Sequence, residues 1–326
     1  MRFFASLALA AMLGAGPALA QQVPEIVADP APTAVDDQLT VLLDWFVNPD
    51  HAPLIIAQEK GFFGREGLTV DLVPPSDPSA PPRLVAAGEA DVAISYQPNL
   101  HLQVKEGLPL VWIGTLVETP LNALVVLDES DIKELKDLKG KTVGFSVGGF
   151  EDALLGMMLE SAGLSLEDVD LVNVNFSLSP SLYAGRVDAV IGAFRNFELN
   201  QMEIDGQPGR AFYPEEHGVP VYDELILETR KELADDPRLP RFLKAVEEAT
   251  IWLTNHPDEA WELFAKAHPD LDDELNRRAW YATLPRFAKR PAALDAGRYD
   301  AFQEFMKERG LIDEVLPIGD YTAIQR

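Results

Sequence analysis

A ten-residue pattern that occurs twice constrains the fold of this chain more than any other feature. Residues 85–94 read Val-Ala-Ala-Gly-Glu-Ala-Asp-Val-Ala-Ile, and residues 182–191 read Leu-Tyr-Ala-Gly-Arg-Val-Asp-Ala-Val-Ile. In each copy we expect a helix to end at the glycine, an aspartate (Asp91 or Asp188) to close the turn, and the apolar residues that follow to enter a sheet. The repeat therefore predicts two α/β units of the same design in one chain.

The segments around each copy alternate short apolar runs with helical periods, which is typical of parallel α/β structure. In the first unit the alternation predicts strands at 39–44, 68–73 and 92–95, and helices at 53–60 and 83–87. In the second unit it predicts strands at 142–146, 169–174 and 189–193, and a helix at 152–162. One more strand, at 224–228, precedes a tail of helical patterns that we expect to return to the first unit.

Two such units predict an α/β protein of two lobes, each a mostly parallel sheet flanked by helices, with a ligand cleft between the lobes. We expect lobe 1 to comprise residues 38–124 and 225–326, and lobe 2 to comprise residues 125–224. The chain would then cross between the lobes twice, at a hinge.

The N-terminal segment is expected to direct export rather than to join the fold. Residues 1–20 have the features of a signal peptide: Arg2, an apolar run, and the small residues Ala18 and Ala20 before a cleavage point. The alternative is a membrane anchor, for which the apolar run is too short. The Pro/Ala-rich, acidic stretch 21–37 is expected to be a flexible leader. These features predict an exported protein.

Composition excludes several classes of function. A formal net charge of −26 argues against nucleic acid as a partner, because phosphates require a basic surface. Without cysteine the chain cannot form disulfides, zinc ribbons, iron–sulfur clusters or a cysteine nucleophile. The five histidines show no metal-binding spacing, and no Gly-x-Ser-x-Gly motif occurs. We therefore expect no metal site.

The most unusual segment follows the first predicted strand, where ligands of open α/β sheets are found. Residues 43–51 read Leu-Asp-Trp-Phe-Val-Asn-Pro-Asp-His, so that Asp44, Trp45, Asn48 and His51 come within one turn. Each could also be a helix cap, a core residue or an exposed side chain. Together they favour a cleft, because an indole offers a flat apolar face and Asp or Asn can hold the edge of a heterocycle.

Two segments of the second unit occupy the corresponding positions. Phe194 and Glu198 follow a strand at a spacing of four residues and would share one face of a helix. An ordinary acidic helix start is the alternative. Gly148 and Gly149 lie between a strand and a helix, where backbone N–H groups can hold an anion. A tight turn would explain these glycines equally well.

Several motifs resemble those of periplasmic binding proteins for thiamine-related pyrimidines. They are Asp-Trp-Phe-Val-Asn-Pro-Asp-His at 44–51, Gly-Phe-Phe at 61–63, Pro-Ser-Asp-Pro at 75–78, the first repeat copy with Ile-Ser-Tyr at 94–96, and Glu-Thr-Pro-Leu-Asn at 118–122. The resemblance covers about residues 38–260. Its first segment is the most specific, whereas Gly-Phe-Phe and Ala-Gly-x-x-Asp also occur in sulfonate- and nitrate-type binding proteins.

The resemblance implies a type II periplasmic binding protein, a monomer by default, that delivers a 4-aminopyrimidine to an ABC permease in the inner membrane. Trp45 and Phe194 would sandwich the ring, with Tyr96 beside it. Glu198 would bond the amino-pyrimidine edge, helped by Asp44 and Asn48. The full set of candidate ligand-binding residues is Asp44, Trp45, Asn48, His51, Tyr96, Asn122, Gly148, Phe194, Asn196 and Glu198.

Two alternatives remain at this point. The ligand could be riboflavin, a sulfonate or nitrate, with the turn at Gly148 and Gly149 as the main anchor. The family also resembles pyrimidine phosphate synthases, which use a lysine that carries pyridoxal phosphate and a histidine that is consumed. Ser95 and Asn99 hold those two places here. Without an amine no Schiff base can form, so we expect a protein that has no cofactor and is not an enzyme.

Overall fold

A computed structural model describes residues 37–325 of the chain. The signal peptide expected at 1–20 and nearly all of the leader expected at 21–37 lie outside the described residues. Within them, every helix is too short or too polar to cross a bilayer.

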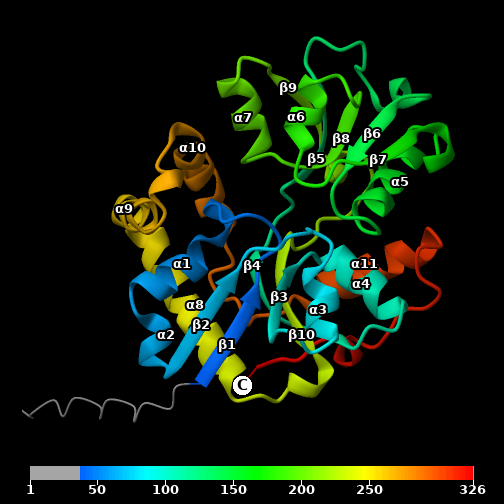
Figure 1. Ribbon diagram of the computed structural model, residues 1–326. Helices are drawn as coiled ribbons and strands as arrows, with labels where there is room; N and C mark the ends of the chain where they lie inside the picture. Colours follow the sequence, from blue (N-terminus) through cyan, green and yellow to red (C-terminus); the bar gives the residue numbers. More distant parts are fainter. Residues whose placement is uncertain (1–36, 326) are drawn as a thin grey trace, which may run out of the picture. The chain divides into compact units, whose positions relative to one another are not determined.

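The first sheet contains five strands in the order β2-β1-β3-β10-β4 (Figure 1). Its strands are β1 (Asp37–Leu42), β2 (Leu68–Val73), β3 (Val92–Ser95), β4 (Leu110–Val117) and β10 (Leu225–Arg230). β1 is parallel to β2 and β3, whereas β10 runs antiparallel to both of its neighbours. The tail thus returns to the first sheet, as the sequence predicts.

The second sheet repeats this arrangement in the order β7-β6-β8-β5-β9. Its strands are β5 (Asn122–Leu127), β6 (Thr142–Phe145), β7 (Asp170–Asn173), β8 (Ala189–Phe194) and β9 (Gly209–Phe212). β6 is parallel to β7 and β8, and β5 is the antiparallel strand. Each lobe is therefore a mixed α/β sheet whose antiparallel strand, β5 or β10, is the first that the chain forms after crossing over.

The lobe boundary expected at residue 124 needs adjustment, because it cuts through β5. All of β5 pairs within the second sheet. β4, which ends at Val117, pairs within the first sheet. We therefore place the first crossing between residues 117 and 122, and the second between the end of β9 at Phe212 and the start of β10 at Leu225.

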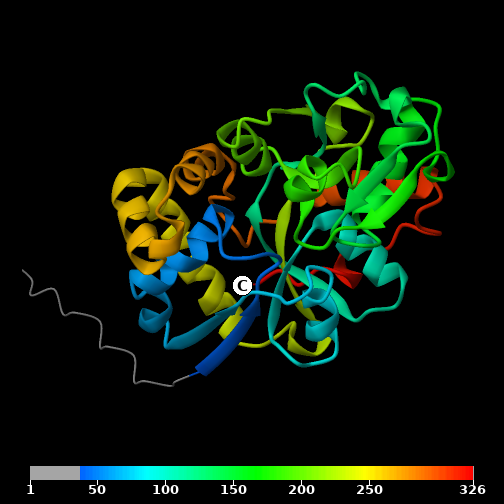
Figure 2. The ribbon, with the colours of Figure 1, turned by 45° about the horizontal axis from the view of Figure 1, so that its top comes forward.

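Helices cover both sheets. In the first lobe they are α1 (Ala52–Glu59), α2 (Phe62–Arg65), α3 (Pro81–Ala86), α4 (Gln97–Lys105), α8 (Arg238–Asn255), α9 (Pro257–Ala267), α10 (Glu274–Thr283) and α11 (Ala296–Glu308). In the second lobe they are α5 (Glu151–Ser161), α6 (Leu178–Tyr183) and α7 (Glu198–Ile204). α8 and α9 pack on α1, and Figure 2 shows these yellow helices beside the blue one. The tail thereby completes the core of the first lobe.

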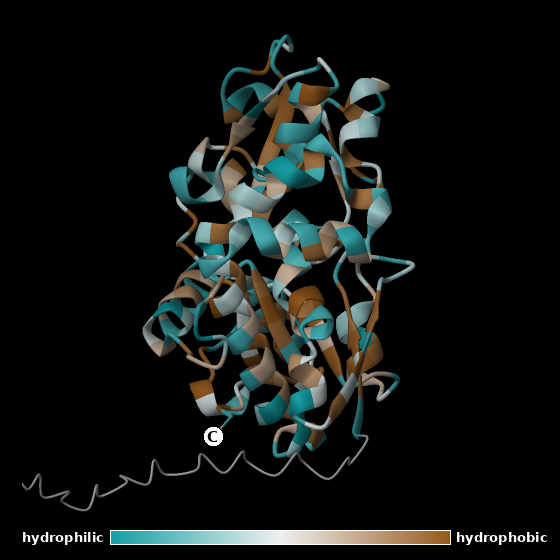
Figure 3. Ribbon diagram, turned by 90° about the vertical axis from the view of Figure 1, so that its left-hand side faces the viewer, coloured by the Kyte–Doolittle hydropathy of each residue, from teal (hydrophilic) through white to brown (hydrophobic). Residues whose placement is uncertain are grey.

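The strands form the apolar interior of both lobes. Every residue of β4 is buried, as are all but the last of β5 and of β10. Figure 3 shows mostly hydrophobic strands between helices that carry both hydrophilic and hydrophobic residues. Uninterrupted burial of this kind is expected for strands covered on both faces.

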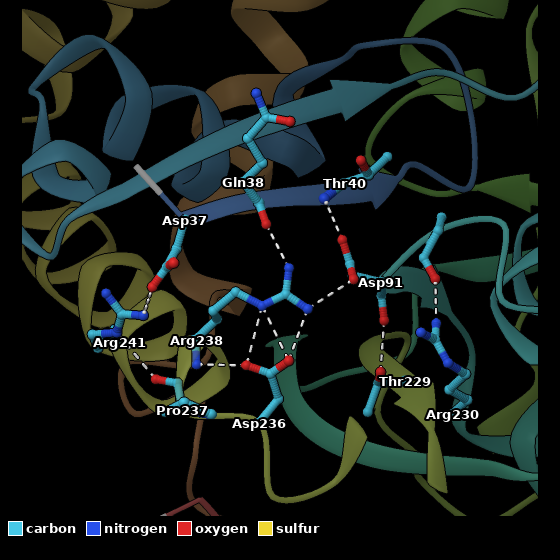
Figure 4. Close-up of polar contacts among 11 residues, drawn as sticks. Asp37, Gln38, Thr40, Asp91, Thr229, Arg230, Asp236, Pro237, Arg238 and Arg241 are labelled. Carbon is cyan, nitrogen blue, oxygen red and sulfur yellow. Dashed lines mark hydrogen bonds and ion pairs between the residues drawn. The ribbon is translucent and has the colours of Figure 1, made fainter. Parts of the chain in front are cut away.

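The repeated aspartates join neighbouring strands of each sheet. Asp91 Oδ2 accepts a hydrogen bond from the backbone N–H of Thr40 in β1 (2.9 Å), and Asp188 Oδ2 accepts one from Thr142 in β6 (2.8 Å). Asp91 also forms an ion pair with Arg238, whose Nη2 lies 3.0 Å from Asp91 Oδ1. Figure 4 shows Arg238 between Asp91 and Asp236. The aspartate of the motif therefore links two strands in each lobe, and in the first copy it also binds Arg238 at the start of α8.

We expect Asp91→Ala to destabilise the protein more than Asp188→Ala. Loss of bonds from a backbone amide and a guanidinium should lower the free energy of unfolding by about 1.5–3 kcal/mol, whereas the single bond of exposed Asp188 contributes about 1 kcal/mol. Urea unfolding of the two variants measures the difference. Equal losses would mean that the Arg238 contact adds nothing.

Candidate ligand-binding site

A cavity is lined by residues of both lobes. The first lobe contributes Asp44, Trp45, Asn48, Asp50 and Tyr96, and the second contributes Glu151, Leu178, Gly192, Phe194, Phe197 and Glu198. Most of them follow the carboxyl ends of β1, β3, β6 and β8. The mixture of aromatic and acidic side chains suits a small ligand with both a flat ring and polar groups.

Asp44 is the centre of the hydrogen bonding in the first lobe's wall. It lies two residues beyond β1 and is 3% exposed. Its Oδ2 accepts a hydrogen bond from the Tyr96 hydroxyl (3.0 Å), and its Oδ1 lies 2.9 Å from His51 Nε2. His51 Nδ1 accepts from the backbone N–H of Asn48 (3.3 Å), so the imidazole hydrogen on Nε2 is the one donated to Asp44. The carboxylate thus holds both the tyrosine and the histidine in place.

Asp50 lies in the turn that precedes α1, and its side chain contacts the second lobe. The Asn48 side chain accepts from the backbone N–H of Asp50 (2.8 Å) at the start of the 3₁₀ turn Pro49–His51. Asp50 Oδ1 then accepts from Asn196 Nδ2 (2.6 Å) and from the Thr283 hydroxyl (2.8 Å). Burial raises the pKa of Asp50 to about 6. This contact ties the loop after β8 to the turn after β1.

Two glutamates supply the carboxyl groups of the second lobe's wall. Glu198 Oε2 accepts from the backbone N–H of Phe194 (2.6 Å), and burial raises the pKa of Glu198 to about 7. Glu151 Oε2 accepts from the N–H groups of Ser146 (2.6 Å) and Val147 (3.1 Å), and burial raises its pKa to about 8. At pH 7 Glu151 is therefore largely protonated and Glu198 partly so, and a protonated carboxyl group has one hydrogen to donate and one oxygen to accept.

Aromatic rings form contacts between the lobes around the cavity. Tyr96 stacks on Phe150, with ring centroids 4.7 Å apart and planes at 15°. Trp45 meets Phe176 edge-on at 4.6 Å, and Phe176 also touches the exposed Phe46 at 4.4 Å. Flat apolar walls of this kind can hold a planar ring.

The wall offers no cationic side chain with which an anion could pair. Four of its eleven residues are acidic and none of them is basic. Sulfonates and nitrate need cationic or N–H-rich surroundings, whereas carboxyl groups suit a ligand with amino and ring-nitrogen groups. Among residues 37–325, no group of three or more potential ligand side chains converges on a metal position.

The structure brings together six of the ten residues expected at the site: Asp44, Trp45, Asn48, Tyr96, Phe194 and Glu198. The other four do not line the cavity. His51 lies behind Asp44, and Gly148 is only half-buried in its turn. Asn122 Oδ1 accepts from the N–H of Gly192 (3.1 Å), and Asn196 is turned toward Asp50 and Thr283. In this arrangement they support the cavity wall, and their direct contact with a ligand stays a prediction.

The ten candidates did not include five of the lining residues, which are Asp50, Glu151, Leu178, Gly192 and Phe197. Asp50 nevertheless lies in the segment 43–51 that the sequence singles out. Asp50 and Glu151 look like helix-capping acids, which are common in first turns. The sequence could have indicated Gly192, because a glycine inside a strand often marks a place where another group approaches the backbone closely. Its φ of +99° and its contact with the Glu151 carboxyl bear out that reason.

The residues at the positions implied for a pyridoxal-phosphate enzyme do not fit that cofactor. Ser95 and Asn99 are buried, and Asn99 Nδ2 lies 3.4 Å from Ser95 Oγ. Neither lines the cavity, and no lysine is among the residues that do. The wall therefore lacks the amine that a Schiff base requires.

We expect the ligand-free protein to be less stable at pH 8.5 than at pH 5. Burial raises the pKa of Asp50, Glu151, Glu198, Glu224 and Glu228 to between about 6 and about 8. The folded state then holds more protons than the unfolded chain from about pH 4 upward, so the free energy of unfolding falls as the pH rises to about 8. Thermal melts should show a Tm lower at pH 8.5 by several degrees.

Glu228→Gln provides the check on this cause. Glu228 is fully buried in β10, and glutamine keeps its size without titrating. Its melts should depend less on pH than those of the unaltered protein. An equal dependence would assign the effect to the net charge of the surface.

Comparison with known proteins identifies relatives of this chain. Residues 48–260 match the family model described as NMT1/THI5 like. A Haemophilus influenzae protein named for thiamine biosynthesis is 54% identical over 292 residues, covering 89% of this chain and 93% of the relative. The formylaminopyrimidine-binding protein of Halalkalibacterium halodurans is 38% identical over 234 residues, covering 70% and 71%.

More distant relatives include both enzymes and binding proteins. The 4-amino-5-hydroxymethyl-2-methylpyrimidine phosphate synthase of Legionella pneumophila is 27% identical over 304 residues, covering 90% of this chain and 93% of that protein. In fold, the chain resembles the alkanesulfonate-binding protein of Xanthomonas axonopodis pv. citri, with a TM-score of 0.70, 17% identity, and coverage of 90% and 99%. The fold is thus that of the periplasmic binding proteins, and the chain belongs to the NMT1/THI5-like family.

Proposed function

We propose that this protein is the solute-binding component of an ABC importer and captures a thiamine-related 4-aminopyrimidine in the periplasm. One observation carries the proposal: an aromatic cavity lined by Asp44, Asp50, Glu151 and Glu198, with no basic side chain in its wall. The formylaminopyrimidine-binding relative supports the ligand class, and the periplasmic-binding-protein fold supports capture without chemistry.

The wall matches the chemistry of an aminopyrimidine. The ring would stack on Trp45 and Phe194, which line the cavity from different lobes. Its amino group and the adjacent ring nitrogen form a donor–acceptor edge, which a protonated carboxyl such as Glu198 complements with one acceptor and one donor. Tyr96, held by Asp44, would lie beside the ring.

Contacts between the lobes would trap the ligand. The hydrogen bonds of Asn196 with Asp50 and Thr283 join the loop after β8 to α10 and to the turn after β1. Because the lobes are connected by two crossings, closure over a ligand is the motion expected of this fold. Asn196 would then favour the closed state rather than contact the ligand.

A thermal-shift screen tests the function. The panel contains 4-amino-5-hydroxymethyl-2-methylpyrimidine, formylaminopyrimidine, thiamine, riboflavin, taurine and nitrate. A ligand at a hundred times its Kd should add about 2.7 kcal/mol of stability, which raises Tm by several degrees. We expect shifts with the aminopyrimidines alone. A shift with riboflavin, taurine or nitrate in their place would leave the fold but refute the ligand class.

The enzyme alternative is tested separately. Addition of pyridoxal phosphate should leave the visible spectrum equal to the sum of its parts, because no lysine faces the cavity. A new Schiff-base absorbance would refute the binding-only role.

A further inference from the structure

Glu151 is a costly residue to place in the cavity wall. It is 4% exposed, at the first turn of α5, and the charged groups that act on it most strongly, Glu224 and Asp152, are themselves acidic. Tyr96, which faces it from the first lobe, is a further group whose ionisation its charge opposes. A buried acid among acids is expensive, so its presence at a ligand cavity indicates a use there.

The backbone fixes the position of this carboxyl group. The N–H groups of Ser146 and Val147 both donate to Oε2, at 2.6 and 3.1 Å. Oε1 lies toward Gly192, where a Cβ atom would stand only 2.2 Å away. Gly192 lines the same cavity in β8 and adopts a φ of +99°, which L side chains rarely adopt. The Glu151 carboxyl group therefore occupies the space that a side chain at position 192 would need.

Resting on the proposed function, we propose that Glu151 is a specificity-determining residue, which donates a hydrogen bond from its protonated carboxyl to an acceptor atom of the bound pyrimidine. A 4-aminopyrimidine has a second ring nitrogen beyond the edge that Glu198 would recognise, and that nitrogen needs a donor. The Tyr96 hydroxyl already donates to Asp44, and the two oxygens of Asp44 are taken up by Tyr96 and His51. A protonated Glu151 supplies the donor.

Protonation allows the Glu151 carboxyl group to act as a hydrogen-bond donor at the cavity. Burial raises the pKa of Glu151 to about 8, so that at neutral pH it is mostly protonated before ligand arrives. Above pH 8 the ligand-free protein must take up a proton to bind, and affinity should fall toward tenfold per pH unit. Glu198, with a pKa raised to about 7, also titrates, so the comparison must be made between variants.

Calorimetric titration with 4-amino-5-hydroxymethyl-2-methylpyrimidine from pH 7 to 9.5 tests the proposal. Glu151→Gln keeps the size, an oxygen for the two backbone N–H groups and an NH₂ donor that does not titrate. We expect it to bind within about threefold of the unaltered protein at pH 7, with a flatter pH profile. Glu151→Met keeps the length but no donor, and should lose roughly tenfold or more in affinity.

Glu228→Gln is the matched control, because Glu228 is as deeply buried, its pKa is also raised to about 8, and it does not line the cavity. Its binding profile should superimpose on that of the unaltered protein. Any one of three results would overturn the role of Glu151. They are a pH profile of Glu151→Gln identical to that of the unaltered protein, full affinity in Glu151→Met, and a flattened pH profile in Glu228→Gln. If the unaltered protein binds no aminopyrimidine, the proposed function fails as well.

Discussion

Replacing Asp44 with alanine is expected to abolish aminopyrimidine binding and to lower the free energy of unfolding by roughly 2–6 kcal/mol. The carboxylate is the hydrogen-bond partner of the His51 Nε2 group (2.9 Å) and of the Tyr96 hydroxyl (3.0 Å), and all three side chains are buried. Each buried polar group that loses its partner costs about 1–3 kcal/mol. Urea unfolding and calorimetric titration measure the two effects.

Two further variants separate binding from stability. Asp44→Asn keeps the shape and can still pair with both partners, so it should fold well enough for its reduced affinity to be measured. Asp37→Ala removes an aspartate from the start of the same strand, where Asp37 forms a partly exposed ion pair with Arg241. Its cost should stay within about 1 kcal/mol. If Asp44→Ala destabilises the protein no more than Asp37→Ala, the buried network is not what holds this wall.

Trp45→Ala should weaken binding of the aminopyrimidine by about thirtyfold or more, equivalent to about 2 kcal/mol. Trp45 lines the cavity and is held edge-on against Phe176, so its indole face is positioned before ligand arrives. Trp45→Phe retains a flat ring and should recover most of the affinity. Calorimetric titration of the two variants gives the comparison.

Trp252→Ala is the control for the loss of an indole. Trp252 is a half-buried residue of α8 that stacks on His256 and lies under Lys60, away from the cavity wall. Its removal should leave ligand affinity unchanged. Full affinity in Trp45→Ala would remove the stacking role, and loss of affinity in both variants would indicate a general effect on the fold.

The elements that were predictable from the sequence are those set by local patterns. β2 and β3 have the bounds that the apolar runs predict, and α1 ends before a glycine at position 61 with a φ of +68°. β4 was not predicted although all its residues are apolar or small, because an unbroken buried run has no period that separates strand from helix. β5 was cut by the expected lobe boundary for the same reason.

For the site as well, the sequence predicted the segments but not the directions of their side chains. The segments that follow β1 and β8 could be selected because ligands of α/β sheets lie beyond strand ends. Which side chains of those segments face the cavity could not. Asn196 points to Asp50 and Thr283, partners 146 and 87 residues away, and Glu151 depends on the absence of a side chain at Gly192.

The sequence by itself determined the two repeated units, the place of an aspartate in each of them, and the acidic and aromatic character of the segments after the strands. Only the tertiary structure decided that Asp50 and Glu151 line the cavity while His51 and Asn196 support it from behind. The physical reason is that secondary structure follows from neighbours along the chain. The direction of a loop side chain follows from hydrogen-bond partners and free space that distant segments provide.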